Sequence, residues 1–196
     1  MNNIDVNGDS IWYTRNGDIV TMHVTAKIFN NSSDNINMAR AAKDIVSDIK
    51  STYEGEFEWS DGKTYNLKVD MDLKVATSMK DVENSDHLFV LADSDSKGAH
   101  GATSMLGGKV MTLASSDFAN NNWLSNNLSY NKTFTATHEF GHAIGLSHSQ
   151  NPFNIMKQGG VVHNSNSNQR VIMLQQQNNL NNNLVVDIYN LGLKWR

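Results

Sequence analysis

The segment from His138 to His148, HEFGHAIGLSH, constrains the fold more than any other part of the chain. In a helix, His138 and His142 lie four residues apart, so their imidazoles project from one face about one turn apart. Gly145 follows His142 by three residues, and glycine readily adopts the positive φ that ends a helix and turns the chain away. That turn can return His148 toward the first two histidines. The segment therefore predicts a helix, a glycine turn and three imidazoles that meet.

Three imidazoles in this arrangement indicate a catalytic zinc site. Zinc favours neutral imidazole nitrogen, and three protein ligands leave a fourth position for water. Glu139 stands beside the first ligand, where its carboxylate can take a proton from that water without binding the metal. A zinc ion that only stabilises the fold is the alternative, but such sites usually have four protein ligands, often cysteines, and the chain has no cysteine. We therefore expect one catalytic zinc with Glu139 as general base.

The segment resembles the long zinc signature of the metzincin metallopeptidases. The residues that follow, SQNPFNIM at 149–156, are similar to the matrixin branch, which has a serine after the third histidine, then a proline and a methionine. The resemblance implies that Met156 is the Met-turn residue, which forms an apolar floor beneath the ligands without coordinating the metal. An ordinary packing role for this methionine would be nearly the same.

Other parts of the chain depart from the matrixin pattern. Matrixins usually have tyrosine or proline after the methionine, whereas Lys157 and Gln158 stand here. They also carry upstream histidines and aspartates for a structural zinc and for calcium, but residues 101–114 contain no histidine, so we expect no second zinc. Residues 93–98 begin like a calcium loop, yet Ser104 occupies the place of the closing glutamate. Calcium is compatible with this run but not indicated.

The chain ahead of the signature predicts strands and one long helix. Alternating apolar residues bounded by turn residues predict strands at 11–14, 19–29, 57–59, 65–75, 87–92, 102–106 and 109–114. Turns around Asn16-Gly17 and Asp61-Gly62 would join the first four strands as two hairpins. Apolar residues at helical spacing predict a helix over residues 38–53, with Ser33 and Asp34 as candidate N-caps.

This order of elements is the one that a metzincin N-terminal subdomain would have. The resemblance implies an α+β, metzincin-like zincin: a mixed twisted β-sheet, an active-site helix, a long N-terminal helix and a small C-terminal subdomain with one helix. It implies one catalytic domain over residues 1–196, with subdomains at 1–148 and 149–196. Residues 101–106 would form the edge strand bordering the cleft, where a peptide substrate could pair with free backbone groups.

Beyond Met156 the pattern is weaker. Residues 159–163 would form the wall of the pocket beside the zinc, and His163 is a candidate contact for substrate, although a role outside the chemistry is favoured. Apolar residues within 166–179 predict a helix. The richness of residues 164–183 in asparagine and glutamine could instead indicate a mobile segment, because asparagine is a poor helix former.

Composition excludes several classes of function. A net charge of −4 and a pI near 5.9 give no basic footprint for nucleic acid, and no apolar run approaches the roughly 18 residues of a membrane span. Residues 1–10 lack the basic start and apolar run of a signal peptide, so localisation is unknown. The resemblance favours a secreted or exported protein. Because residues 1–196 contain no cysteine, we expect no cysteine-switch latency of the kind that many matrixins have. We expect a monomer.

The remaining histidines and the tryptophans have ordinary readings. His23, His87 and His100 are expected to be surface or hydrogen-bonded polar residues, not ligands. The four tryptophans are widely spaced in the sequence, and we interpret them as packing residues.

The sequence predicts a zinc metalloendopeptidase that hydrolyses peptide bonds of a peptide or protein substrate through a zinc-activated water. Three alternatives stay open: a zinc amidase acting on a non-protein amide, a non-catalytic zinc-stabilised peptide-binding module, and a toxin-type protease domain released from a larger secreted protein.

Overall fold

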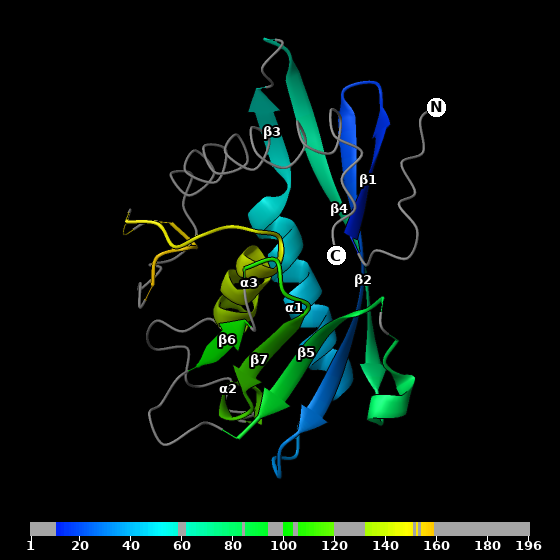
Figure 1. Ribbon diagram of the computed structural model, residues 1–196, viewed down its shortest axis with the longest axis vertical. Coiled ribbons are helices and arrows are strands. Elements are labelled where there is room, and N and C mark those ends of the chain that lie inside the picture. The colour runs from blue at the N-terminus through cyan, green and yellow to red at the C-terminus, as the bar shows by residue number, and fades with distance from the viewer. Residues whose placement is uncertain are drawn as a thin grey trace.

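A seven-stranded mixed sheet is the central element of the fold (Figure 1). A computed structural model describes residues 11–58, 62–83, 85–93, 100–103, 106–119, 132–150, 152 and 154–158. The strands are β1 (Ile11–Asn16), β2 (Ile19–Asn31), β3 (Gly55–Glu58), β4 (Thr64–Ala76), β5 (His87–Ala92), β6 (Gly101–Thr103) and β7 (Val110–Ala114). The helices are α1 (Met38–Tyr53), the 3-10 helix η1 (Met79–Asp81), α2 (Ser116–Ala119) and α3 (Lys132–Ala143). None of the described helices is long and apolar enough to cross a membrane.

The strand order is β3-β4-β2-β5-β7-β6, and β1 pairs with the first half of β2. The long strand β2 runs parallel to β4 and β5, while β3 and β6 run antiparallel to their neighbours. The hairpin between β1 and β2 closes with Asn16 opposite Ile19. Its two-residue loop begins at Gly17, whose φ of 61° suits a tight hairpin turn.

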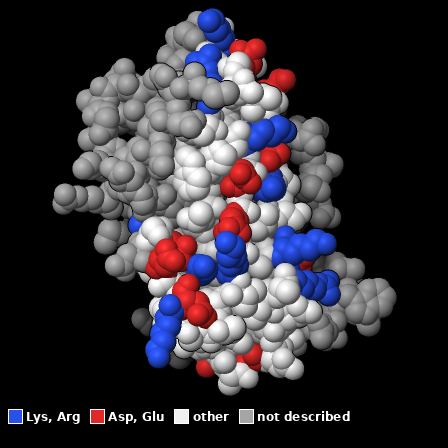
Figure 2. Space-filling view, turned by 90° about the vertical axis from the view of Figure 1, so that its right-hand side faces the viewer, with Lys and Arg blue, Asp and Glu red and all other residues white. Residues whose placement is uncertain are grey.

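Alternation of side chains separates the two faces of the sheet. Along β2, Met22 and Val24 are buried, whereas His23 between them is partly exposed on the other face. The same period of two places Val69 inside and Asp70 outside on β4. The face of the molecule in Figure 2 carries basic and acidic side chains interspersed, without a broad patch of one sign.

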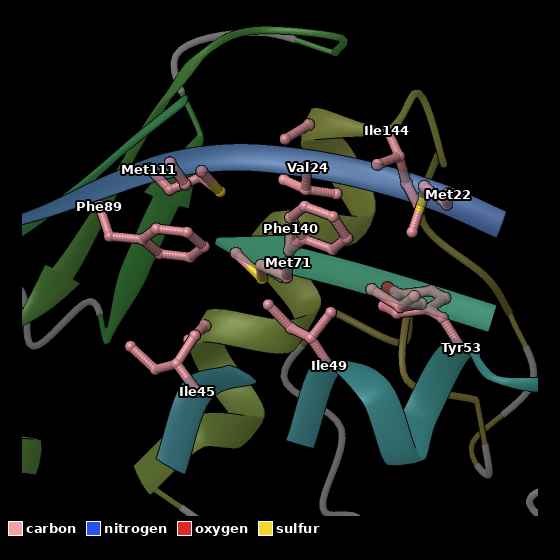
Figure 3. Close-up of a cluster of buried hydrophobic side chains, with 14 of the residues drawn as sticks. Met22, Val24, Ile45, Ile49, Tyr53, Met71, Phe89, Met111, Phe140 and Ile144 are labelled. Atoms are coloured by element: carbon pink, nitrogen blue, oxygen red, sulfur yellow. The ribbon is translucent and has the colours of Figure 1, made fainter. Parts of the chain in front are cut away.

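Two helices cover the inner face of the sheet. Helix α1 packs on β4 and β2, α3 packs on β6 and β7, and the helices contact each other (Figure 1). Figure 3 shows Phe140 of α3 among apolar side chains of β2 and β4, with Ile45 and Ile49 of α1 in the same cluster. All three side chains are fully buried. Helix α3 is therefore held by the main hydrophobic core and not by surface contacts.

Helix α1 has the predicted bounds, but its predicted N-caps are wrong. The cap is Asn37, whose side-chain oxygen accepts from the main-chain N–H of Arg40 at 3.0 Å. Asp34 instead accepts a 2.6 Å hydrogen bond from the Ser115 hydroxyl, at the far end of β7. Ser33 lies with Asp34 in the loop before the helix. The Asp34 side chain therefore bonds to a residue distant in the sequence and does not cap the helix.

The α+β class and the mixed sheet of a metzincin-like fold are confirmed. The strand predicted at 102–106 is shorter, because β6 ends at Thr103 and Leu106 lies in a turn with 57% of its surface exposed. The expected pocket wall at 159–163, the C-terminal helix at 166–179 and His163 lie outside the described residues, as do most residues of the 149–196 subdomain. That subdomain division stays a prediction.

Burial of His87 at the start of β5 predicts a pH dependence of stability. Burial, with a smaller contribution from Lys109, lowers the pKa of His87 from 6.5 to about 4. The unfolded chain then binds a proton more tightly than the folded protein does. Stability is full above about pH 6.5 and falls as the pH drops toward 4, by about 3 kcal/mol if this histidine acts alone.

Urea unfolding of wild type and His87→Gln between pH 4 and 7 measures this contribution. The difference in unfolding free energy between the two proteins should change across this window. Thr25 has no group that titrates in this range, so Thr25→Val provides a control and should keep the wild-type dependence. Parallel curves for wild type and His87→Gln would contradict the assignment.

Candidate active site

Helix α3 and the turn after it bring three histidines together. His138 and His142 lie one turn apart on α3, which ends at Ala143. Gly145 has a φ of 90° and donates its N–H to the His142 carbonyl at 2.9 Å. Leu146 donates to the Gly141 carbonyl at 2.8 Å, which completes the pair of bonds of a Schellman motif. The chain therefore turns sharply at the end of α3, and the residues after the turn bring His148 to His138 and His142.

The imidazoles of His138, His142 and His148 converge on one point. Their potential ligand atoms all lie within 4.8 Å of one another. His142 Nε2 and His148 Nε2 are 3.1 Å apart, and the ring centroids of His138 lie 4.8 and 5.4 Å from those of His142 and His148. His138 is buried and His148 is exposed, so the cluster reaches from the core to the surface.

Main-chain carbonyls orient two of these rings. His138 Nδ1 lies 2.6 Å from the Ile155 carbonyl oxygen, and His142 Nδ1 lies 2.7 Å from that of Leu146. A carbonyl only accepts, so each Nδ1 carries the hydrogen and each Nε2 keeps a lone pair for a metal. Burial also lowers the pKa of His138, which favours the neutral ring that a metal needs.

The donor set fits one zinc ion. Ligands about 2.0 to 2.1 Å from a tetrahedral zinc lie roughly 3.3 to 3.4 Å from each other. The 3.1 Å between the Nε2 atoms of His142 and His148 is close to that value, and no pair of the three ligand atoms is more than 4.8 Å apart. All three donors are imidazole nitrogens, and the group contains no carboxylate.

Glu139 lies next to the cluster but outside it. The residue is 6% exposed, and its carboxylate faces β6, where Thr103 Oγ1 lies 2.6 Å from Oε2. A buried carboxylate beside the imidazoles is suited to proton transfer without metal binding. Sequence reasoning did not find Thr103, because the contact joins residues 36 positions apart.

Met156 packs against helix α3 at Gly141, the residue before His142. The residue is fully buried in a turn, in which Lys157 N–H donates to the Asn154 carbonyl at 2.9 Å and the Asn154 side chain accepts from Met156 N–H at 2.7 Å. A Cβ at Gly141 would lie 2.7 Å from the Tyr53 hydroxyl oxygen and closer still to the Met156 sulfur. Absence of a side chain at Gly141 therefore lets the methionine reach the helix backbone.

Other described histidines lie apart from the cluster. His23 bonds to Asp70 at 3.0 Å, and His100 pairs with Asp117 at the same distance, so both have the polar roles that were predicted. His87 is 5% exposed at the start of β5. Within the described part of the chain, the three converging histidines are the only potential metal-binding group of three or more side chains.

The mixed sheet, the helix with two of the three converging imidazoles and the buried Glu139 agree with the zinc-peptidase fold and site that the sequence predicted. Residues 18–177 match the sequence model of peptidase family M10, described as Matrixin. The match covers most of the chain, which therefore belongs to the matrixin family of zinc metallopeptidases.

The search of curated protein sequences finds no match. Among solved structures, the fold is similar to the crystal structure of archaemetzincin from Methanopyrus kandleri, at 14% sequence identity and a TM-score of 0.42. That alignment covers 79% of this chain and 95% of the archaemetzincin chain.

Close contact between Met156 and Gly141 predicts coupled effects on stability. Met156→Leu nearly conserves volume and should cost less than about 1.5 kcal/mol while zinc is retained. Gly141→Ala should be destabilising, because overpacking costs about 1 to 3 kcal/mol and outweighs the roughly 1 kcal/mol that alanine gains as a helix former. The double variant Gly141→Ala/Met156→Ala should lose less unfolding free energy than the sum of the losses in the two single variants.

Urea unfolding of the single and double variants, with zinc determined on each folded protein, tests this coupling. Additive costs, or loss of zinc from folded Met156→Leu, would show that the contact is misassigned.

Proposed function

We propose that the chain is a zinc metalloendopeptidase in which His138, His142 and His148 hold the zinc and Glu139 is the general base. One observation carries the proposal: three imidazole nitrogens converge beside a buried carboxylate that stands outside their group. Three protein ligands leave one coordination position for a reactant, as in catalytic zinc sites. A structural site would use four.

When bound, zinc lowers the pKa of water toward neutrality and polarises the scissile carbonyl. Glu139 accepts the proton that the attacking water loses and then gives a proton to the leaving amine nitrogen. The water oxygen first bonds to the carbonyl carbon. The C–N bond then breaks as the amine nitrogen receives its proton, and no covalent bond forms to the protein. Met156 contributes by packing, because its sulfur lies against the backbone of α3 and supports the two ligands there.

A peptide substrate would lie along β6. This strand is the last one in the order of the described sheet, and its pairing with β7 occupies one of its edges. An extended peptide could pair with the other edge through main-chain hydrogen bonds. Contacts between β6 and α3 then set the peptide beside the three imidazoles.

The first test is metal content. We predict one zinc per chain by elemental analysis, and strongly weakened zinc binding in His148→Ala, because one of three ligands is lost. His100→Ala serves as the matched control and should keep the wild-type affinity, since His100 pairs with Asp117 away from the cluster. Two stoichiometric zincs, or equal affinities of His148→Ala and wild type, would contradict the ligand set.

The second test separates catalysis from metal binding. Glu139→Gln should keep zinc and nearly the wild-type thermal transition, because the carboxylate lies outside the ligand group. Its rate of peptide hydrolysis should fall by about a hundredfold to ten-thousandfold or more, the usual contribution of general acid–base assistance. The exposed Glu56 gives a control, and Glu56→Gln should stay fully active.

Cleavage of a diverse peptide library, with sequencing of the products, supplies the rates. Comparable activity of Glu139→Gln would refute the assigned base. A zinc-loaded wild type that retains peptides but cleaves none would instead be a binding module, and cleavage of non-protein amides alone would indicate an amidase.

A further inference from the structure

The Glu139 carboxylate has a hydrogen-bond partner on the edge strand. Thr103 Oγ1 lies 2.6 Å from Glu139 Oε2 and 3.0 Å from the main-chain oxygen of the same residue. Its hydroxyl has one hydrogen, so it donates chiefly to the nearer carboxylate oxygen. A separation of 2.6 Å is at the short end of the range for a hydrogen bond between a hydroxyl and an oxygen acceptor. Among the described residues, Thr103 is the one whose side chain donates to this carboxylate.

This contact depends on close approach of β6 to α3. Residues 101 and 103 point to the same side of the strand. A Cβ at Gly101 would lie 2.5 Å from Thr135 Cγ2, 3.1 Å from Glu139 Cγ and 3.2 Å from the Thr112 carbonyl oxygen. The carbonyl belongs to the neighbouring strand and cannot move freely. Glycine at 101 therefore lets the strand lie close enough for the Thr103 hydroxyl to reach the carboxylate.

The bond restrains a side chain that would otherwise have rotational freedom. With Oε2 held toward β6, the glutamate keeps one rotamer, and its second oxygen is the one left for proton transfer. The restraint also opposes a rotation that would bring the carboxylate into the group of imidazoles. Because the same strand is the proposed docking edge, the hydroxyl fixes the base relative to the substrate backbone as well as to α3.

We infer that Thr103 is a positioning residue for the general base and acts through Glu139 without touching the substrate. This inference rests on the proposed peptidase function. A displacement of a catalytic group by about 1 Å from its productive position lowers the rate of the chemical step more than it weakens substrate binding. Loss of the hydroxyl should therefore reduce kcat and leave KM nearly unchanged.

The test compares three variants by steady-state peptide hydrolysis, with zinc content and thermal transition measured on each. Thr103→Val removes the hydroxyl at nearly constant shape and should lower kcat about 10- to 100-fold. Thr103→Ser restores the donor and should recover most of that loss. The matched control is Thr25→Val on the opposite face of the sheet, which should behave as wild type. All three should bind one zinc and unfold near the wild-type temperature.

A double variant shows whether Thr103 works through the glutamate. In a Glu139→Gln background, Thr103→Val should lower the residual rate by less than twofold, because the group that it positions is already gone. A merely structural role would lower the rate equally in both backgrounds.

The outcomes separate the two proposals. An active wild type, an impaired Glu139→Gln and a fully active Thr103→Val overturn the positioning role alone. So does a Thr103→Ser as slow as Thr103→Val, or a raised KM at unchanged kcat. A wild type that hydrolyses no peptide, or a Glu139→Gln as fast as wild type, overturns the proposed function and this inference with it.

Discussion

Close packing around helix α3 is the constraint on which the site depends. Two glycines permit it from different directions: Gly141 admits the Met156 sulfur and the Tyr53 hydroxyl, and Gly101 admits the edge strand. Tyr53 also donates to the Thr137 carbonyl at 3.0 Å, which connects the end of α1 to α3. Close-packed protein interiors are hardly compressible, so contacts this tight leave α3 little freedom to shift or rotate. The positions of His138 and Glu139 follow from that placement.

Hydrogen bonds to main-chain carbonyls then orient the imidazole rings of His138 and His142. The Ile155 carbonyl comes from the turn that carries Met156, so one short segment both supports the helix and orients His138. The Leu146 carbonyl orients His142 from the residue directly after Gly145. The chain segment that turns away from α3 is thus also the one that selects the nitrogen left for the metal. Second partners of this kind commonly fix the tautomer and direction of metal-binding histidines.

Local patterns in the sequence were sufficient to predict what depends on local spacing. The helix over residues 38–53 and the hairpins β1–β2 and β3–β4 were predicted from apolar residues that recur every two to four positions. The structure has these elements nearly as expected. Convergence of three imidazoles was predicted from their spacing and one glycine. The N-cap prediction failed at Asp34, whose side chain bonds to Ser115, 81 residues away, while the neighbouring Asn37 caps the helix. The predicted strand at 102–106 was too long, because β6 ends at Thr103. Thr103 and the Gly141–Met156 contact gave no sequence signal, since each joins segments that meet only in the folded chain.

The central claim is that three imidazoles alone hold the zinc and leave the carboxylate free for proton transfer. X-ray absorption at the zinc edge, measured on the zinc-loaded wild type and on Glu139→Gln, tests it most directly because it reports the ligands themselves. The account predicts three imidazole nitrogens at about 2.0 to 2.1 Å in both proteins. Fewer than three imidazoles in the wild type, or a change in the protein ligands when Glu139 is replaced, would contradict it.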